Sequence, residues 1–495
     1  MKNSQNNPLA MLFLVIALIA GAMQFVAPDA PDKTFIGGIL VLVIATFIIL
    51  FFSKLSEPKP VNWLTVDVLF AGTFSVIHFA YFFYWWAGLT EGLGQIWHIR
   101  AANVPHTVCS ALAMYLCAVN VFLFGFHIIR TVRFEPIIND ALASKTLMKS
   151  WGKLGRLLVR LGFGGFLGYV VLVGPAVVFG SYSGTNNHGF LPNVSFQLGQ
   201  VFLSSGVAVL ILSRQRAFSG RKSKRNFFGL SMIEAFLILT TLGAIGLHGD
   251  RSTLMFVLLP VLIARSEYVK TFRFSTLSWA AVALIGLLGF IVSARSVADG
   301  DYKFKPLESI NGALLNLGTS SICGFVAIDH IDRRNELYLG QMQTLHLMGA
   351  VPFSRRLAGV TDSPENSSSM LMTLLVQGKV GKGVAGTGTS VFADFYLDFG
   401  FWGTNIIFLL VGMFNKSFQN KVRGSTSLTW HVAFVCNLSF MTLCSRYTMF
   451  GGLIRFVLHT SIYVWLIAYC LGIPTRYRKR RQANFHPAML PNQSR

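Results

Sequence analysis

Two aspartates stand four residues apart at the start of a long apolar run. Asp394 and Asp398 lie in the segment 386–403, which leads from a glycine-rich stretch into that run. Residues at this spacing share one face of a helix, so we expect both carboxylates at the mouth of one membrane span. A charge inside a bilayer costs about 2.5–3.5 kcal/mol on insertion scales, so such residues need a reason to be there.

Arginines occur at the ends of three other apolar runs. Arg251 begins one run, Arg446 ends a second and Arg455 lies near the start of a third. Together with the two aspartates, these side chains are expected at one depth near the outer face of a membrane. Arginine recognises phosphate in a bidentate way, so a cluster of arginines at this level suits a lipid-linked diphosphate.

The segment 295–403 is the only long stretch that is not mostly apolar. Loops longer than about 15 residues are usually functional or disordered. Leu, Met and aromatic residues occur throughout this one, which argues against disorder. We therefore expect an ordered extramembrane cap with the chemistry at its base. Four arginines of this segment are expected above the diphosphate: Arg333, Arg334, Arg355 and Arg356.

Each of these residues also has a structural interpretation. Arg251 could be a snorkelling charge at the end of a turn. Arg446 and Arg455 could pair with the two aspartates as structural bridges, and Asp394 could be the N-cap of its helix. Four further polar residues fit structural roles at least as well as functional ones: Asp67, Glu234, His346 and His459.

The composition predicts a helical membrane protein. The 495 residues are 53% hydrophobic and only 13% charged, against a usual charged share of about 25%. Apolar runs of about 18–22 residues follow one another along the chain. We therefore expect an all-α, polytopic protein with about twelve transmembrane helices. The predicted spans are 9–27, 35–53, 62–84, 107–129, 157–179, 194–213, 228–248, 252–269, 275–293, 391–414, 430–449 and 452–473.

Lys and Arg are distributed unequally between the connections. One set of connections holds most of them, together with both termini, whereas the short connections of the other set hold only Lys33, Arg100 and Arg251. The positive-inside rule places the first set in the cytoplasm and the long segment outside. The net charge of +22 then faces anionic lipid heads, so no nucleic acid partner is needed to explain it. The expected divisions are nine helices in 1–293, the large outer loop in 294–390, three helices in 391–473 and a basic cytoplasmic tail in 474–495.

Three other patterns give weak signals. Only Cys323 of the six cysteines lies in the long loop, and there is no C-x-x-C pair. We therefore expect neither a disulfide framework nor a zinc site. A single Cys109–Cys323 disulfide is the one alternative. The glycine-rich stretch 378–388 resembles a phosphate loop in composition but lacks its residue order and lies on the face where ATP is absent. The stretch 329–332 (Asp-His-Ile-Asp) has metal-binding residue types, but nothing else fixes a ligand set.

Three features of the chain resemble the O-antigen polymerase (Wzy-type) family of bacterial inner-membrane glycosyltransferases. They are the late outer loop, the Gly249-Asp250-Arg251 sequence before a span and the run 388–403. That family often shows an acidic residue, an aromatic two positions on, then an aromatic–glycine pair and a further glycine. The matching residues here are Asp394, Tyr396, Phe399, Gly400 and Gly403. The family often has Glu where Asp394 stands and Asn where Asp398 stands. The resemblance implies a GT-C-like architecture in the inner membrane, with a periplasmic loop and cytoplasmic termini.

The resemblance also implies a reaction, the polymerisation of undecaprenyl-diphosphate-linked repeat units into O-antigen or capsule. A hydroxyl of the incoming unit would attack the reducing-end anomeric carbon of the growing glycan, and undecaprenyl diphosphate would leave. The implied general base is Asp394, or else His346. Positioned arginines can stabilise the charged leaving group, so no metal or other cofactor is implied. The residues implied to hold the diphosphate are Arg251, Arg446, Arg455 and the loop arginines Arg333, Arg334, Arg355 and Arg356, with Asp398, Tyr396 and Gly400 in support.

The partners that the resemblance implies are lipid-linked glycans, membrane lipids and a chain-length regulator protein.

Three alternative functions are considered beside the polymerase. An O-antigen ligase, which transfers the glycan to lipid A core, would have the same general topology, but we see no clear H-x-x-x-N loop motif. A lipid-linked glycan flippase or other transporter would place charges along a path through the membrane midplane. A non-catalytic partner in envelope assembly would not depend on Arg251.

Overall fold

The computed structural model of this chain describes residues 8–57, 61–89, 104–130, 145–175, 190–219, 230–248, 251–268, 271–279, 283, 286, 319–350, 354–361, 363–378, 380 and 388–475. Within these ranges the chain forms helices and no β-strand. The predicted all-α class is therefore confirmed for the described residues.

The longer helices follow the apolar runs of the sequence. They are α1 (Pro8–Met23), α2 (Lys33–Leu55), α3 (Val66–Trp86), α4 (Val108–Ile128), α6 (Lys145–Val173), α8 (Phe190–Ser219), α9 (Met232–His248), α10 (Arg251–Tyr268), α17 (Val391–Arg423), α18 (Leu428–Leu443) and α20 (Thr460–Cys470). The shorter elements are α13 (Ile322–Arg334), α14 (Gln341–Ala350), α15 (Ser354–Leu357), α16 (Ser368–Gln377), the turn η9 (Cys444–Arg446), α19 (Met449–Gly452) and the π-helix η10 (Leu453–His459).

Nine helical stretches of the described chain are long and apolar enough to cross a membrane, so the protein has the helices of a multi-pass membrane protein. They are Pro8–Val26, Lys33–Leu55, Val66–Trp86, Pro105–Ile128, Thr146–Val173, Leu191–Arg214, Val391–Arg423, Leu428–Arg446 and Met449–Cys470. These nine coincide with nine of the twelve predicted spans.

The other three predicted spans are not established. The span at 228–248 appears as α9, which has 17 residues, whereas crossing a bilayer takes about 20. The span at 252–269 appears as α10, whose 18 residues include Arg251, Arg265 and Glu267. The span at 275–293 lies mostly outside the described residues.

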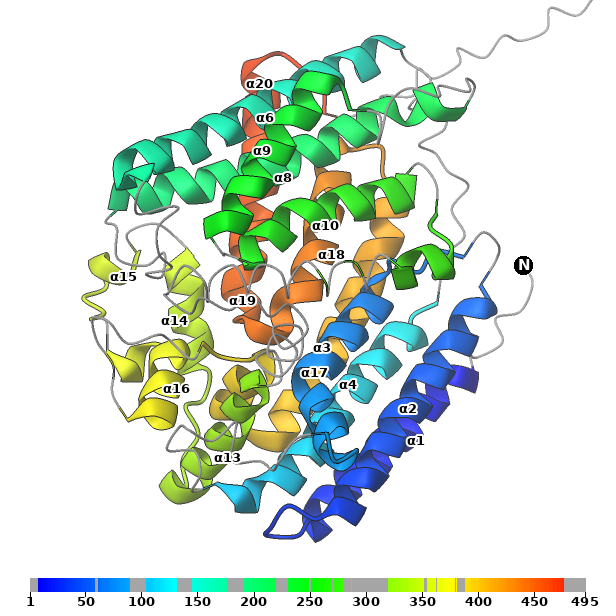
Figure 1. Ribbon diagram of the computed structural model, residues 1–495, viewed down its shortest axis with the longest axis vertical. Helices are drawn as coiled ribbons and strands as arrows, with labels where there is room; N and C mark the ends of the chain where they lie inside the picture. The colour runs from blue at the N-terminus through cyan, green and yellow to red at the C-terminus, as the bar shows by residue number, and fades with distance from the viewer. Residues whose placement is uncertain are drawn as a thin grey trace, which may run out of the picture.

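Helix α4 lies at the centre of one bundle. It packs against α1, α2, α3 and α17, and most of its residues are buried (Figure 1). Its contact with α17 is close because each helix places a glycine against the backbone of the other. A Cβ on Gly125 would lie 2.4 Å from Leu409 O, and one on Gly412 would lie 2.2 Å from Phe122 O. Small residues let helix backbones approach in this way, so α17 is held firmly against α4.

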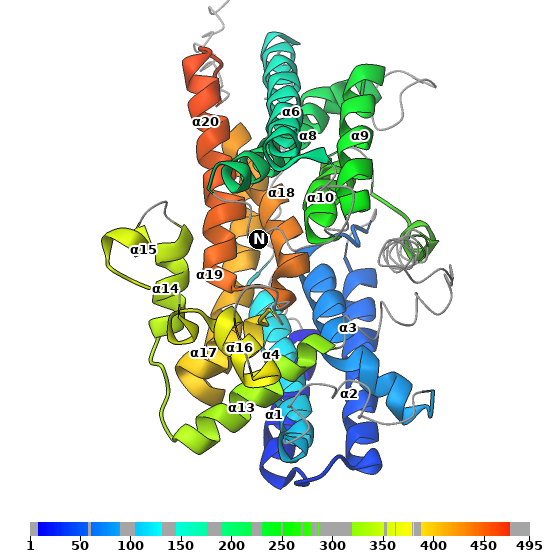
Figure 2. The ribbon, with the colours of Figure 1, turned by 60° about the vertical axis from the view of Figure 1, so that its left-hand side comes forward.

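Two other groups of helices adjoin this bundle. Helices α6 and α8 pack along each other and cross the end of the molecule near the close of α20, where Trp151 Nε1 donates to Pro474 O over 2.9 Å (Figure 1). Helices α13, α14 and α16 gather beside α17 at the other end (Figure 2). The described part of the segment 294–390 therefore consists mostly of short helices, and its placement as an extramembrane cap stays a prediction.

Helix α17 is broken at Gly400. This residue has φ 62° and ψ −163°, although helix flanks it on both sides. Residues other than glycine rarely adopt these backbone angles. Before the break, the residues from Val391 to Asp398 are all buried, so the first turns of α17 are enclosed by protein on every side. The helix begins at Ser390, whose Oγ accepts from Ala393 N over 3.1 Å. Ser390, not Asp394, is thus the N-cap.

Gly400→Ala is expected to destabilise the protein by about 1–3 kcal/mol, because alanine is strained at this φ and ψ. The measurement is the temperature at which the detergent-solubilised chain is lost from its size-exclusion peak. Gly72→Ala in α3 is the matched control, because a Cβ there has no neighbour within 4 Å. The control should be equal in stability or up to about 1 kcal/mol more stable. Equal melting of both variants would contradict a strained break at Gly400.

Candidate functional site

His346 of α14 is the centre of a buried polar cluster. Its Nε2 lies 2.9 Å from Ser368 Oγ of α16 and 3.7 Å from Asp394 Oδ2 of α17. The Asp394 side chain is fully buried and that of His346 is 12% exposed. Thr389 Oγ1 donates to Asp394 Oδ1 over 2.8 Å, whereas Oδ2 makes no hydrogen bond within the described chain. The two residues predicted as alternative bases are thus neighbours, and the imidazole is the more accessible of the two.

The Ser368–His346–Asp394 grouping is not a nucleophilic triad. In such a triad the hydroxyl and the carboxylate hold opposite nitrogens of the imidazole. Here both approach the same atom, Nε2. Proton transfer to His346 or Asp394 is the chemistry that this geometry permits, rather than attack by Ser368.

Burial and nearby arginines keep His346 uncharged at neutral pH. Burial lowers the pKa of His346 to about 4, with a contribution from Arg355 and a smaller one from Arg455, while Asp398 opposes the shift. A neutral imidazole can accept a proton. The two arginines that act on it also show that cationic groups lie close to this cluster.

Asp398 holds the start of α14. Its Oδ1 accepts from Met342 N over 3.0 Å and its Oδ2 accepts from Gln343 N over 2.9 Å. Tyr338 N adds a backbone bond of 3.0 Å to Leu397 O. The free N–H groups and positive dipole at a helix start favour a carboxylate there. Asp398 therefore anchors α14 on α17 and sets where His346 lies.

Two arginines flank the other end of α14. Arg455 Nη2 donates to Gly349 O over 2.9 Å. A Cβ on Gly349 would lie 3.6 Å from Arg355 Cδ and 4.0 Å from Arg455 Nη2, so both side chains meet there. Arg355 also donates from Nη2 to Asn366 O. Arg455 belongs to the π-helix η10, and π-helical turns frequently occur at functional sites.

Arg446 lies in η9, at the end of α18, and is half-buried. It forms no hydrogen bond or ion pair with any residue that the structure describes, so it is not a bridge to either aspartate. Arg446 and Asp394 both act on the thiol of Cys323, the first lowering and the second raising its pKa, while burial raises it to about 12. Burial is the larger effect, so Cys323 stays protonated.

The alternative in which Arg446 and Arg455 pair with the two aspartates does not hold within the described chain. Asp394 and Asp398 accept hydrogen bonds from Thr389 and from the start of α14. Arg455 instead bonds a backbone carbonyl. The positive charge of these arginines is therefore not neutralised by the aspartates.

Arg333 and Arg334 do not join this cluster. Arg333 Nε is bonded to Asp329 Oδ1 at 2.9 Å, and Arg334 Nη1 donates to Tyr338 Oη over 3.0 Å. Both are exposed and engaged by residues of their own segment. The side chains of Arg251 and Arg356 lie outside the described residues, as do Gly249 and Asp250.

The remaining predicted residues have structural contacts. Tyr396 is buried and stacks on Phe392 with 5.7 Å between ring centroids. Asp329 also lies 3.1 Å from His106 Nε2, and no three His, Cys, Asp or Glu residues of the described chain could hold a metal together. All six cysteines are free, so Cys109 and Cys323 are not bridged. Glu234 accepts from Arg214 over 2.8 Å, as its structural interpretation predicts.

No sequence pattern pointed to Ser368 or Gln343, and only a weak one pointed to Thr389. Ser368 lies in a run of three serines, and only the fold brings it to His346. Thr389 precedes the N-cap Ser390, a position where a polar residue before an apolar run signals a helix start. Gln343 is one turn before His346 and is buried, with 4% exposure.

A second ionic cluster lies at the opposite end of α4. Lys54 Nζ is 3.0 Å from Asp67 Oδ2, which also lies 3.2 Å from His127 Nε2. Asp67 is thus a paired, packing carboxylate, as its structural interpretation predicts. Phenylalanines fill the space between the two clusters, with ring centroids 4.2 Å apart for Phe70–Phe122, 6.1 Å for Phe70–Phe408 and 6.0 Å for Phe395–Phe408.

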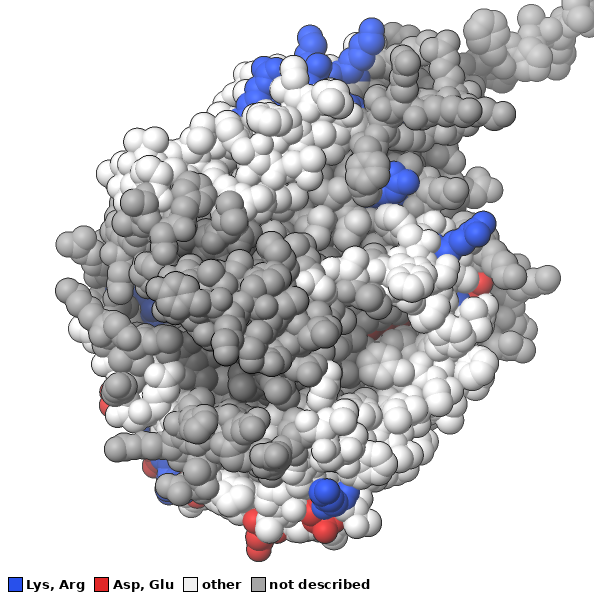
Figure 3. Space-filling view, in the orientation of Figure 1, with Lys and Arg blue, Asp and Glu red and all other residues white. Residues whose placement is uncertain are grey.

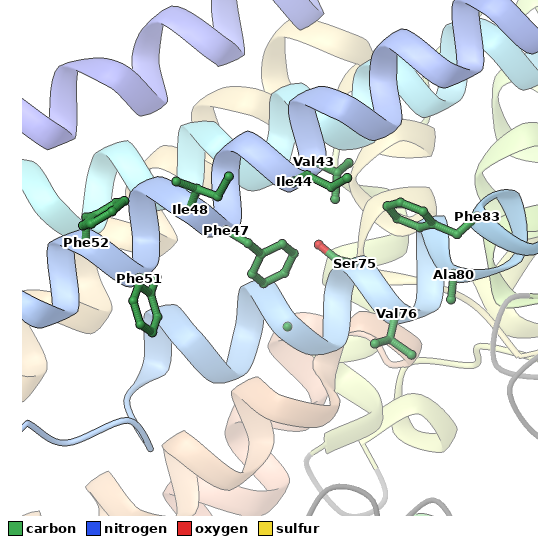
Figure 4. Close-up of a pocket in the computed structure, with 11 residues that line it drawn as sticks. Val43, Ile44, Phe47, Ile48, Phe51, Phe52, Ser75, Val76, Ala80 and Phe83 are labelled. Atoms are coloured by element: carbon green, nitrogen blue, oxygen red, sulfur yellow. The ribbon is translucent and has the colours of Figure 1, made fainter. Parts of the chain in front are cut away.

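An apolar pocket between α2 and α3 has no such chemistry. It has a volume of about 440 Å³ and is lined by residues such as Val43, Phe47, Val76 and Phe83, with Ser75 as its one polar side chain (Figure 4). Nothing in this lining could bind a charge or move a proton. The His346 cluster therefore remains the candidate site.

Comparison with known proteins adds no relative: the chain matches no protein-family model, no curated protein and no solved structure.

Asp398→Ala is expected to loosen the start of α14, because it leaves the N–H groups of Met342 and Gln343 unpaired at about 1–3 kcal/mol each. Hydrogen exchange of a peptide covering 338–346 should become faster in the folded protein. The control is Asp32→Ala, which removes the side chain that accepts from Phe35 N at the start of α2. It should speed exchange only near residue 35. Unchanged exchange at 338–346 would show that Asp398 does not anchor α14.

His346 is expected to make stability depend on acid pH. Its folded pKa of about 4 lies below the ordinary 6.5, so between these values the unfolded chain binds a proton there and the folded chain does not. The contribution is complete above pH 6.5 and is lost as the pH falls toward 4, up to about 3 kcal/mol. The melting temperature of His346→Gln should therefore fall less between pH 7 and about 4.5 than that of the wild type. Parallel pH profiles would rule out a depressed pKa.

Proposed function

We propose that this chain is a membrane glycosyltransferase. It would polymerise undecaprenyl-diphosphate-linked oligosaccharide repeat units into surface polysaccharide, either O-antigen or capsule. The observation that carries the proposal is a buried carboxylate–imidazole pair, Asp394 and His346, with Arg455 bonded to the helix of His346 and Arg446 close enough to act on Cys323, as Asp394 does. Neither arginine is paired with a carboxylate of the described chain. This combination suits proton removal from a hydroxyl next to a departing diphosphate.

The distribution of exposed charge supports a reaction at the periplasmic face of the inner membrane. Exposed basic residues gather over α6 at one end of the molecule (Figure 3), and they include Lys149, Lys153, Arg156 and Arg160. The positive-inside rule assigns such an end to the cytoplasm. The His346 cluster lies at the opposite end of α17 from Lys421 and Arg423, so it would face the periplasm under the α13–α16 helices.

The arginines would hold the leaving group. When the bond to the anomeric carbon breaks, its electron pair stays on the diphosphate oxygen and adds a negative charge, which fixed cations can stabilise without a metal. Arg455 uses Nη2 to bond Gly349 O, and its other guanidinium N–H groups bond no carboxylate of the described chain. Arg446 is half-buried and has no hydrogen-bond partner in the described chain. Arg355, which meets Arg455 at Gly349, would complete this end of the site.

His346 would take the proton from the attacking hydroxyl. The hydroxyl oxygen forms the new bond to the anomeric carbon, the bond from that carbon to the diphosphate oxygen breaks, and the proton passes to imidazole. The imidazolium would then be stabilised by Asp394, whose Oδ2 lies 3.7 Å away. This assignment makes His346 the base and Asp394 its support, because Asp394 is completely buried.

The packing between the two ionic clusters favours an enzyme over a transporter. A transport path would join the outer cluster to the Lys54–Asp67 pair through polar groups. Instead Phe395, Phe408 and Phe70 lie in contact between them. The chemistry is thus confined to one end of the bundle.

The test measures surface-glycan length in a strain lacking this chain and complemented with variants. His346→Ala, Asp394→Asn and a double Arg446→Gln/Arg455→Gln variant should each reduce polymer assembly by about 100-fold or more, with membrane abundance unchanged. Arg160→Gln is the matched control, an exposed arginine of α6 without an ion-pair partner in the described chain. It should restore wild-type lengths.

The strain lacking the chain separates the alternatives. Single-unit caps alone, together with the failure of the three variants, support the polymerase. Long lipid-linked polymer that is never attached to lipid A core would replace the polymerase by a ligase. Unchanged polymer length and attachment would show that the chain is not an enzyme of this pathway.

A further inference from the structure

Gln343 buries a side-chain amide that has no partner in the described chain. Its side chain is 4% exposed, and neither Nε2 nor Oε1 forms a hydrogen bond there. Most buried polar side-chain atoms of native proteins have a hydrogen-bond partner, so one that lacks any needs an explanation. Neither the donor nor the acceptor of this amide is used within the described chain.

The position of Gln343 is fixed. Its own N–H donates to Asp398 Oδ2 over 2.9 Å. It lies one turn before His346, and helix residues three apart are neighbours on one face. Asp394 Oδ2, which lies 3.7 Å from His346, is also buried without a hydrogen bond in the described chain. The N-terminal half of α14 therefore carries a neutral amide beside the carboxylate–imidazole pair.

The two halves of α14 differ in chemistry. Gly349 follows His346 by three residues, a rise of about 4.5 Å, and there Arg355 and Arg455 meet the helix. Diphosphate oxygens only accept hydrogen bonds, so they suit the arginine end. A sugar hydroxyl both donates and accepts, as a carboxamide does, so hydroxyls suit the Gln343 end.

We propose that Gln343 binds a hydroxyl of the acceptor sugar, next to the hydroxyl that loses its proton to His346. This inference rests on the proposed function and deepens it, because it divides the site into an acceptor end and a diphosphate end along α14. Gln343 is a binding residue in this arrangement. It moves no proton.

The decisive variant is Gln343→Met, which keeps the length of the side chain and removes the amide. Removing an unpaired buried amide does not weaken the folded state, so the melting temperature should be equal or higher. Losing hydrogen bonds to the acceptor should raise KM about tenfold and leave kcat within about twofold. The substrate is the lipid-linked single unit extracted from the strain lacking this chain, and the readout is the initial rate of polymer formation by the purified protein.

Gln419→Met is the matched control. Gln419 is 2% exposed and its Oε1 also lacks a hydrogen bond in the described chain, but it lies toward the other end of α17. The control should keep wild-type KM and kcat. Loss of activity in both variants would show that any buried glutamine matters to the fold, and so would overturn a specific role for Gln343.

Two further results would overturn the inference. A melting temperature of Gln343→Met more than about 3 °C below wild type would show that the amide has a structural partner. An unchanged KM would show that it does not touch the acceptor. Failure of the proposed function is seen separately, in the wild-type protein, which would then form no polymer from the single units. The acceptor role of Gln343 would fall with it.

Discussion

The carboxylate of Asp398 and the backbone N–H groups of Met342 and Gln343 hold the site together. Without these two hydrogen bonds, the backbone bond from Tyr338 N to Leu397 O would be the remaining hydrogen bond between the start of α14 and α17 in the described chain. Because the start of the helix is fixed, His346 is fixed one turn later, opposite Asp394. Gly349 is fixed nearly one turn beyond that, within reach of Arg455. A single charged cap thus aligns groups from α14, α17 and η10.

The enclosure of α17 decides which partners its aspartates have. From Val391 to Asp398 the helix is surrounded by protein, and polar groups there must find partners inside it. Asp398 and one oxygen of Asp394 do so. The remaining oxygen of Asp394 faces His346, and the arginines stay apart from both aspartates. Asp394 Oδ2 and the side-chain amide of Gln343 are thus two of the buried polar groups that lack a hydrogen bond in the described chain, and both belong to this cluster.

The sequence predicted the class of the fold better than the roles of its residues. Hydropathy located nine stretches that the structure gives as long apolar helices, while the predicted spans at α9 and α10 stay predictions, because α9 has 17 described residues and α10 carries Arg251, Arg265 and Glu267. Asp394 and Asp398 were predicted on one helix face, and they are. Their different roles could not be predicted, because the partners of Asp398 are more than fifty residues away in the chain. The pairing of Arg333 with Asp329 has the ordinary four-residue helix spacing, and weighing it would have removed Arg333 from the phosphate-binding set.

The break at Gly400 divides α17 into two parts with different attachments. The part before the break is bonded to α14 and its preceding turn and also meets Tyr115 of α4 through Phe392, whereas the part after it is packed against α4 through Gly412. Gly400 is therefore the point at which a tilt of the α13–α16 helices would be absorbed. Because Asp394 lies on the α14 side of this joint, the carboxylate would travel with His346. Asp394 and His346 would therefore keep their 3.7 Å separation if these helices tilted.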